Sequence, residues 1–168
     1  MGMFDDINNH RGTQGGVYFH PDHHYMVEIE RCKLGKTRRN VDMFVAECKV
    51  IETDSDERKP GSVVSFLVTL DKDPALDNIA DFARNGLWVL GRDSGMDDLP
   101  SKSDEIVLND AIITNDICGE DNVLAGLRVG VFAYNKPTKA GNPFTRHRWM
   151  APEEAQQNIA LAQGHAAQ

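Results

Sequence analysis

Hydrophobic and polar residues alternate along three segments in the first half of the chain, and a period of two is the pattern of half-buried β-strands. These segments cover residues 25–32, 43–51 and 62–70. Two further alternating segments, 126–134 and 144–149, flank a turn-rich basic loop, which is the pattern of a β-hairpin. The first two segments have a clear apolar face. Its residues are Tyr25, Val27, Ile29, Phe44, Ala46, Cys48 and Val50.

After the third strand the apolar period becomes that of a helix. Asp73 is placed to cap its N-terminus, Pro74 suits its first position, and Gly86 predicts its end. The apolar stripe consists of Ala75, Ile79, Phe82 and Ala83. A second helix is predicted within residues 103–113, and the Ala- and Gln-rich residues 151–168 predict a short helix or a frayed tail.

The order of elements predicts a mainly β protein. Three strands, a helix, a further helical insert and a hairpin follow the order of the five-stranded, OB-fold-like Greek-key barrel. We place this domain at residues 17–150, after a mobile polar arm at 1–16 and before the tail at 151–168. A small β-sandwich and a strand-swapped α+β domain are the alternatives.

Composition sets limits on the class of protein. The 168 residues suit one domain, and no run of eighteen apolar residues or secretory signal appears, so no membrane partner is expected. The three cysteines are odd in number and far apart, which favours reduced thiols and a cytoplasmic location. The net charge of −8 argues against a binder of duplex DNA. The charges are segregated, however, and a locally basic surface can bind an anion on an acidic protein.

Basic residues gather in two loops, 34–40 and 135–143, which in an OB-fold border the oligonucleotide-binding face. In the hairpin they alternate with aromatic residues, the combination that binds phosphates and stacks on bases of a single strand. Strand alternation places Phe132 and Tyr134 on one face, and Phe144, Arg146 and Arg148 opposite a core Trp149. The alternative is a sheet with an ordinary charged outer face. The candidate nucleic-acid-binding residues are Lys33, Lys36, Arg38, Arg39, Tyr134, Lys136, Lys139, Phe144, Arg146 and Arg148.

Four segments resemble phage-encoded OB-fold single-stranded-DNA-binding proteins. They are residues 3–6 with the following arm and strand, 44–47, 75–82, and 124–149. The resemblance implies sequence-tolerant binding and protection of single-stranded DNA, with RNA as an alternative ligand, during phage replication or recombination. Self-association and contacts with replication or recombination proteins are the partners it implies. Residues 163–168 differ from the acidic, aromatic tip of bacterial single-strand-binding proteins.

Catalytic patterns are weak in this sequence. The run from His20 to His24 lacks the spaced partners of a zinc site, and Asp77 and Asp81 suit the wet face of a helix. No phosphate loop or nucleophile motif is present. We therefore expect no enzyme, metal or cofactor. The alternative function is a β-barrel virion-structural or assembly protein without a nucleic-acid ligand.

Overall fold

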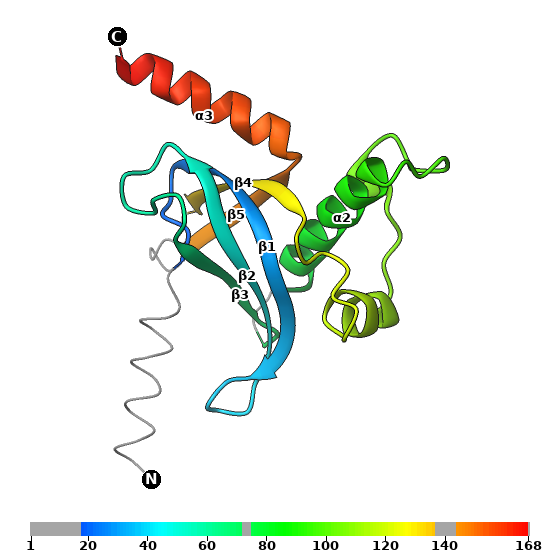
Figure 1. The fold of residues 1–168 in the computed structure, drawn as a ribbon. Helices are drawn as coiled ribbons and strands as arrows, with labels where there is room; N and C mark the ends of the chain where they lie inside the picture. Colours follow the sequence, from blue (N-terminus) through cyan, green and yellow to red (C-terminus); the bar gives the residue numbers. More distant parts are fainter. Residues whose placement is uncertain (1–17, 72–74, 137–143, 168) are drawn as a thin grey trace.

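The computed structural model describes residues 18–71, 75–136 and 144–167. The predicted arm at 1–16, Asp73, Pro74 and Lys139 lie outside these residues. One antiparallel sheet contains five strands in the order β3-β2-β1-β4-β5 (Figure 1). The strands are β1 (His23–Lys36), β2 (Asp42–Thr53), β3 (Val63–Thr69), β4 (Arg128–Lys136) and β5 (Phe144–Met150). The prediction of a mainly β protein with five strands is confirmed.

The sheet is strongly curved but open. Among the described residues, no backbone ladder joins the edge strands β3 and β5. Their inward side chains nevertheless meet, because the ring of Phe66 on β3 lies 5.0 Å from the rings of His147 and Trp149 on β5. Two register shifts along β1 allow this bend, since a bulge kinks a strand and increases its twist.

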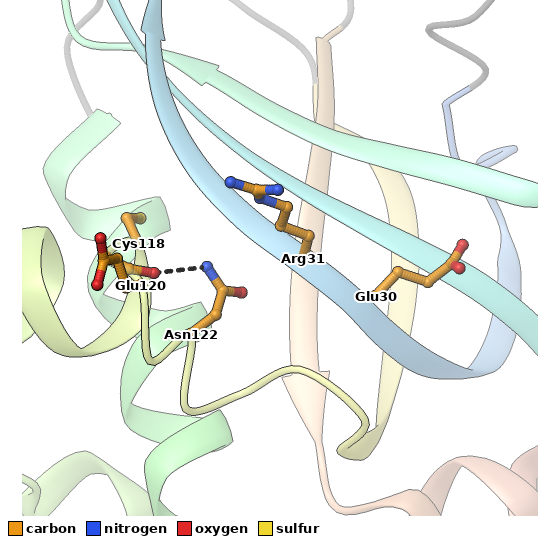
Figure 2. A pocket seen from close by; sticks show the side chains of 6 residues that line it. Glu30, Arg31, Cys118, Glu120 and Asn122 are labelled. Atoms are coloured by element: carbon orange, nitrogen blue, oxygen red, sulfur yellow. Dashed lines mark hydrogen bonds between the residues drawn. The ribbon is translucent and has the colours of Figure 1, made fainter.

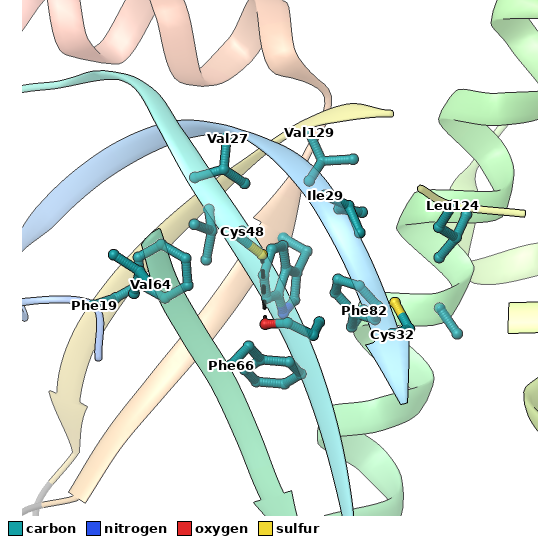
Figure 3. Packing of buried hydrophobic residues seen from close by; sticks show 14 of the residues in the cluster. Phe19, Val27, Ile29, Cys32, Cys48, Val64, Phe66, Phe82, Leu124 and Val129 are labelled. Atoms are coloured by element: carbon teal, nitrogen blue, oxygen red, sulfur yellow. Dashed lines mark hydrogen bonds between the residues drawn. The ribbon is translucent and has the colours of Figure 1, made fainter. Parts of the chain in front are cut away.

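The core fills the inside of the curve. The apolar faces predicted for β1 and β2 are confirmed, and all their residues are fully buried. Figure 3 shows Val64, Phe66 and Phe82 close together on the inner side of the curved sheet. Helix α2 (Ala75–Asp93) contributes Phe82, whose ring lies 5.6 Å from Phe44 and 4.7 Å from Trp149. Phe19, which the sequence pattern did not single out, also packs on Tyr25 at 4.9 Å.

The predicted end of α2 at Gly86 is wrong. Gly86 lies inside the helix, and a Cβ atom there would come within 2.9 Å of the Leu124 side chain. The glycine is therefore a packing site for Leu124, which lies beside α2 in Figure 3. The helix ends at Asp93 and is capped by Gly95, which has a φ of +74°. The Gly95 N–H donates to Arg92 O, and the Met96 N–H donates to Gly91 O.

The predicted helix at 103–113 is also wrong. The structure has a short 3₁₀ turn, η1 (Ser103–Glu105), and a π-helical segment, η2 (Ile112–Ile117). Side chains of α2 take up the carbonyls of this region: Arg84 Nε donates to Ile106 O at 3.1 Å, and Trp88 Nε1 to Pro100 O at 2.8 Å. A continuous helix would need the Ile106 carbonyl for its own ladder, so tertiary bonds replace it.

The C-terminal residues form helix α3 (Pro152–Ala167), which packs on the outer side of the sheet against β1 and β4. Ala155 and Ile159 are buried on α3, and Met26 and Met150 are buried on the sheet. Gly130 of β4 permits the close approach, because a Cβ atom there would collide with Ala155 and with Met150 Cγ. Within the described ranges, no helix combines the length and apolar character needed to cross a bilayer.

Candidate nucleic-acid interface

The hairpin of β4 and β5 has one inner and one outer face. On β4, Val129, Val131 and Ala133 are buried, so Phe132 and Tyr134 point outward together, as predicted. The register places Arg148 opposite Phe132 and Arg146 opposite Tyr134. Trp149 pairs with Val131 on the inner face and is 8% exposed, which confirms its place in the core.

Three rings form a continuous row on the outer face, here called the aromatic row (His24, Phe132 and Tyr134). The ring centroids of His24 and Phe132 are 4.4 Å apart, and those of Phe132 and Tyr134 are 5.8 Å apart with planes 16° from parallel. His24 comes from β1, which pairs with β4 so that His24 lies opposite Phe132. Burial lowers the pKa of His24, and Arg148 lowers it further against the opposing influence of Asp54. The ring is therefore uncharged at neutral pH and extends the aromatic surface.

The two hairpin arginines differ in accessibility. The Arg148 side chain is 67% exposed and forms an ion pair with Glu154 of α3 at 3.2 Å. Arg146 is half-buried, and within the described residues its Nε atom has no hydrogen-bond partner. Its charge also acts on Asp81 of α2, where Arg84 and Arg146 oppose the desolvation that raises the pKa of that carboxyl. Arg148 is thus the more accessible cation beside the aromatic row.

The basic loop between β1 and β2 lies at the other end of β1. His23, at the start of β1, pairs with Ala133 of the hairpin, whereas Lys36, at its end, pairs with Asp42. A strand of 14 residues separates the two positions along the sheet. The β1–β2 loop therefore lies at the opposite end of β1 from the described part of the β4–β5 hairpin. The turn itself is centred on Thr37–Asn40 rather than on the predicted Gly35, and Asn40 adopts a φ of 65°.

The loop cations are partly engaged within the protein. Lys33 Nζ lies 3.0 Å from Glu47 Oε1, and Lys36 Nζ lies 2.7 Å from Asp42 Oδ1. Arg38 and Arg39 are exposed. Of the hairpin candidates, the structure describes the backbone of Lys136 and Phe144, which pair with each other, while their side chains lie outside the described part.

The histidine run beside the aromatic row forms two carboxylate pairs. His23 Nδ1 lies 3.0 Å from Asp54 Oδ1, and His20 Nε2 lies 3.5 Å from Glu57 Oε2. These contacts join the chain entering β1 to the loop after β2. In the part of the chain that the structure describes, no cluster of three or more His, Cys, Asp or Glu side chains is suited to a metal ion.

A pocket of about 580 Å³ lies beside the second half of β1, away from the aromatic row. Glu30 and Arg31 of β1 line it together with Cys118, Glu120 and Asn122, and in Figure 2 the Glu30 side chain extends away from the last three. The amide of Asn122 bonds both backbone groups of Cys32, at 2.8 and 2.7 Å, and so replaces a neighbouring strand. Burial raises the pKa of the Cys118 thiol to about 11, so it is protonated at neutral pH and is a weak nucleophile.

No family model matches the chain, and no curated protein sequence matches it significantly.

Proposed function

We propose that this protein binds single-stranded DNA on the outer face of the β4–β5 hairpin. The observation that carries the proposal is the aromatic row, which lies on the same face as the exposed cation Arg148. A nucleobase stacks beside Tyr134, and the Arg148 guanidinium contacts a backbone phosphate. Stacking needs no particular base, so binding is tolerant of sequence.

The chemistry of this face favours a single strand over a duplex. A base inside a duplex is already stacked on both sides, and removing it costs a few kcal/mol. A base in a single strand can stack on Tyr134 without that cost. The net charge of −8 also disfavours the broad phosphate surface of a duplex. RNA is the alternative ligand, because base stacking does not distinguish the two sugars.

The fold supports the same proposal. Opening a five-stranded Greek-key barrel between its third and fifth strands gives a sheet in the order β3-β2-β1-β4-β5, and we propose an OB-fold on this basis. The role proposed is binding and protection during phage replication or recombination, without catalysis. Lys136, Lys139, Phe144 and Arg146 of the same hairpin remain predicted contributors. Lys33, Lys36, Arg38 and Arg39, which the sequence also suggested, are not part of the proposed site, because the β1–β2 loop lies at the other end of β1 from the aromatic row.

The test is a titration of fluorescent oligo-dT and of a matching duplex at several salt concentrations. Oligo-dT binds more tightly, and its affinity falls as salt rises. Tyr134→Ala weakens binding by about 5- to 150-fold, equivalent to the roughly 1–3 kcal/mol of one base–aromatic stack. Tyr18→Ala is the matched control, because Tyr18 is 48% exposed but is not part of the aromatic row. Equal affinity for both nucleic acids, or equal effects of the two substitutions, contradicts the proposal.

A second candidate, assembly with other protein subunits, is favoured by the outer side of β3. Val63 and Leu67 are 43% and 37% exposed there, on an edge strand of the sheet. Exposed apolar residues on an edge strand can pair with another chain. Sedimentation of the parent and of Leu67→Lys, without nucleic acid, tests this candidate. A monomer in both cases excludes self-assembly through β3.

A further inference from the structure

Helix α3 crosses the outer face of the sheet from one strand to the next. It begins at Pro152, directly after β5, and Ala155 then lies over Gly130 of β4. One residue later, Gln156 Nε2 lies 3.3 Å from Glu52 Oε1 on β2. In Figure 1 the helix continues beyond the sheet at the top of the view. The first half of α3 therefore lies across the strands rather than along them.

Several contacts hold this half of α3 in place. Arg92 of α2 binds both carboxylate oxygens of Glu153, at 2.8 and 2.7 Å. Arg148 of β5 pairs with Glu154, and the buried Ala155 fills the space that Gly130 leaves. Bidentate arginine–carboxylate contacts fix orientation as well as distance. The helix is thus attached to α2, β4 and β5 together.

Because of this position, α3 divides the outer face into two areas. Along β4, Phe132 and Tyr134 lie on one side of Gly130, and Arg128 lies on the other. Along β1, His24 precedes the buried Met26, and Lys33 follows it. The aromatic row and Arg148 therefore occupy one area, and the cations of the β1–β2 loop belong to the other.

We infer that a bound single strand is confined to the hairpin side of α3 and does not continue across the sheet to the β1–β2 loop. This inference rests on the proposed function. A strand at Tyr134 and Phe132 meets the buried Gly130–Ala155 contact if it continues along β4. To reach the β1–β2 loop, the nucleic-acid strand must cross over α3, and a helix has a height of about 10 Å above the sheet. That height exceeds the screening length of about 8 Å at physiological salt, so the loop cations attract it little.

The experiment compares two sets of substitutions in the full chain at physiological salt. One set removes the loop cations together: Lys36→Ala, Arg38→Ala and Arg39→Ala. The other is the single change Arg148→Ala. Binding is measured by fluorescence anisotropy with oligo-dT of about 4 to 16 nucleotides, the range of site sizes for one OB-fold. Thermal melting confirms that each variant is folded.

The loop variant binds every length within about twofold of the parent, because its missing charges lie beyond the screening length. Arg148→Ala loses roughly tenfold, as expected for one charge-assisted phosphate contact. A loop variant that weakens fivefold or more on the longer oligonucleotides alone overturns the inference and shows a path across α3. Absence of binding by the parent at all lengths instead rejects the proposed function, and the inference with it.

Discussion

Protonation of His147 is expected to destabilise the protein in mild acid. The imidazole lies on the inner face of β5, with its ring 5.0 Å from Phe66 and 5.7 Å from Phe19. Burial, and to a smaller extent the neighbouring Arg146, lower its pKa from 6.5 to about 4. The folded protein therefore holds this histidine neutral over a pH range in which the unfolded chain protonates it.

The sign and size of the effect follow from this difference. Because the unfolded state binds the proton first, the free energy of unfolding is unaffected above about pH 6.5 and falls as the pH drops towards 4. A difference of about 2.5 pKa units, at about 1.4 kcal/mol per unit, corresponds to a loss of roughly 3 kcal/mol. Against a usual stability of about 5–15 kcal/mol, that loss is easily measured.

The assay is urea unfolding of the parent and of His147→Leu at several pH values from neutral to mildly acid. Leucine does not titrate, so the variant keeps every other acid-sensitive group and lacks only this one. The parent loses about 3 kcal/mol relative to the variant between pH 7 and 4. A stability difference between the two proteins that stays constant over this range refutes the assignment of a neutral, partly buried His147.

Three further substitutions test the packing and the hairpin face. Trp149→Ala truncates a core residue and should cost about 3–5 kcal/mol of unfolding free energy, measured by urea denaturation; a loss below 1 kcal/mol would place the indole outside the core. Gly130→Ala puts a methyl group against Ala155 and should cost about 1–3 kcal/mol by overpacking, whereas an unchanged stability would show that α3 is not docked there. Glu154→Gln releases Arg148 from its ion pair and should strengthen oligo-dT binding by up to about fivefold, given the roughly 1 kcal/mol of an exposed pair; weaker binding would mean that Glu154 positions Arg148 for the ligand.

The strands could be predicted because their signal is local. Alternation of side chains is a property of the extended backbone, so the apolar faces of β1 and β2 are visible in the sequence itself. The same rule placed Trp149 inward and Arg148 outward within a single strand. In each case the prediction needed only that one face of the strand is buried.

The bounds of the helices were harder to predict than the strands, because the local sequence signals for where a helix ends are ambiguous. Gly86 and Gly95 are equally plausible helix ends by composition. The choice between them depended on Leu124, a residue far along the chain whose side chain fills the space beside Gly86. Likewise, the stretch at 103–113 was predicted to be helical, but Arg84 of α2 binds the carbonyl of Ile106 within it.

The candidate site depended most on tertiary structure. Tyr134 and Arg148 were visible as a pattern in the hairpin, but His24 joins the aromatic row only because β1 pairs with β4 across about a hundred residues. The distance of the β1–β2 loop from the described hairpin strands and the position of α3 over Gly130 are also decided by long-range pairing. The sequence by itself determined which side chains share a face, because that follows from backbone geometry. Only the folded sheet decided which faces meet, because those contacts are set by packing between distant segments.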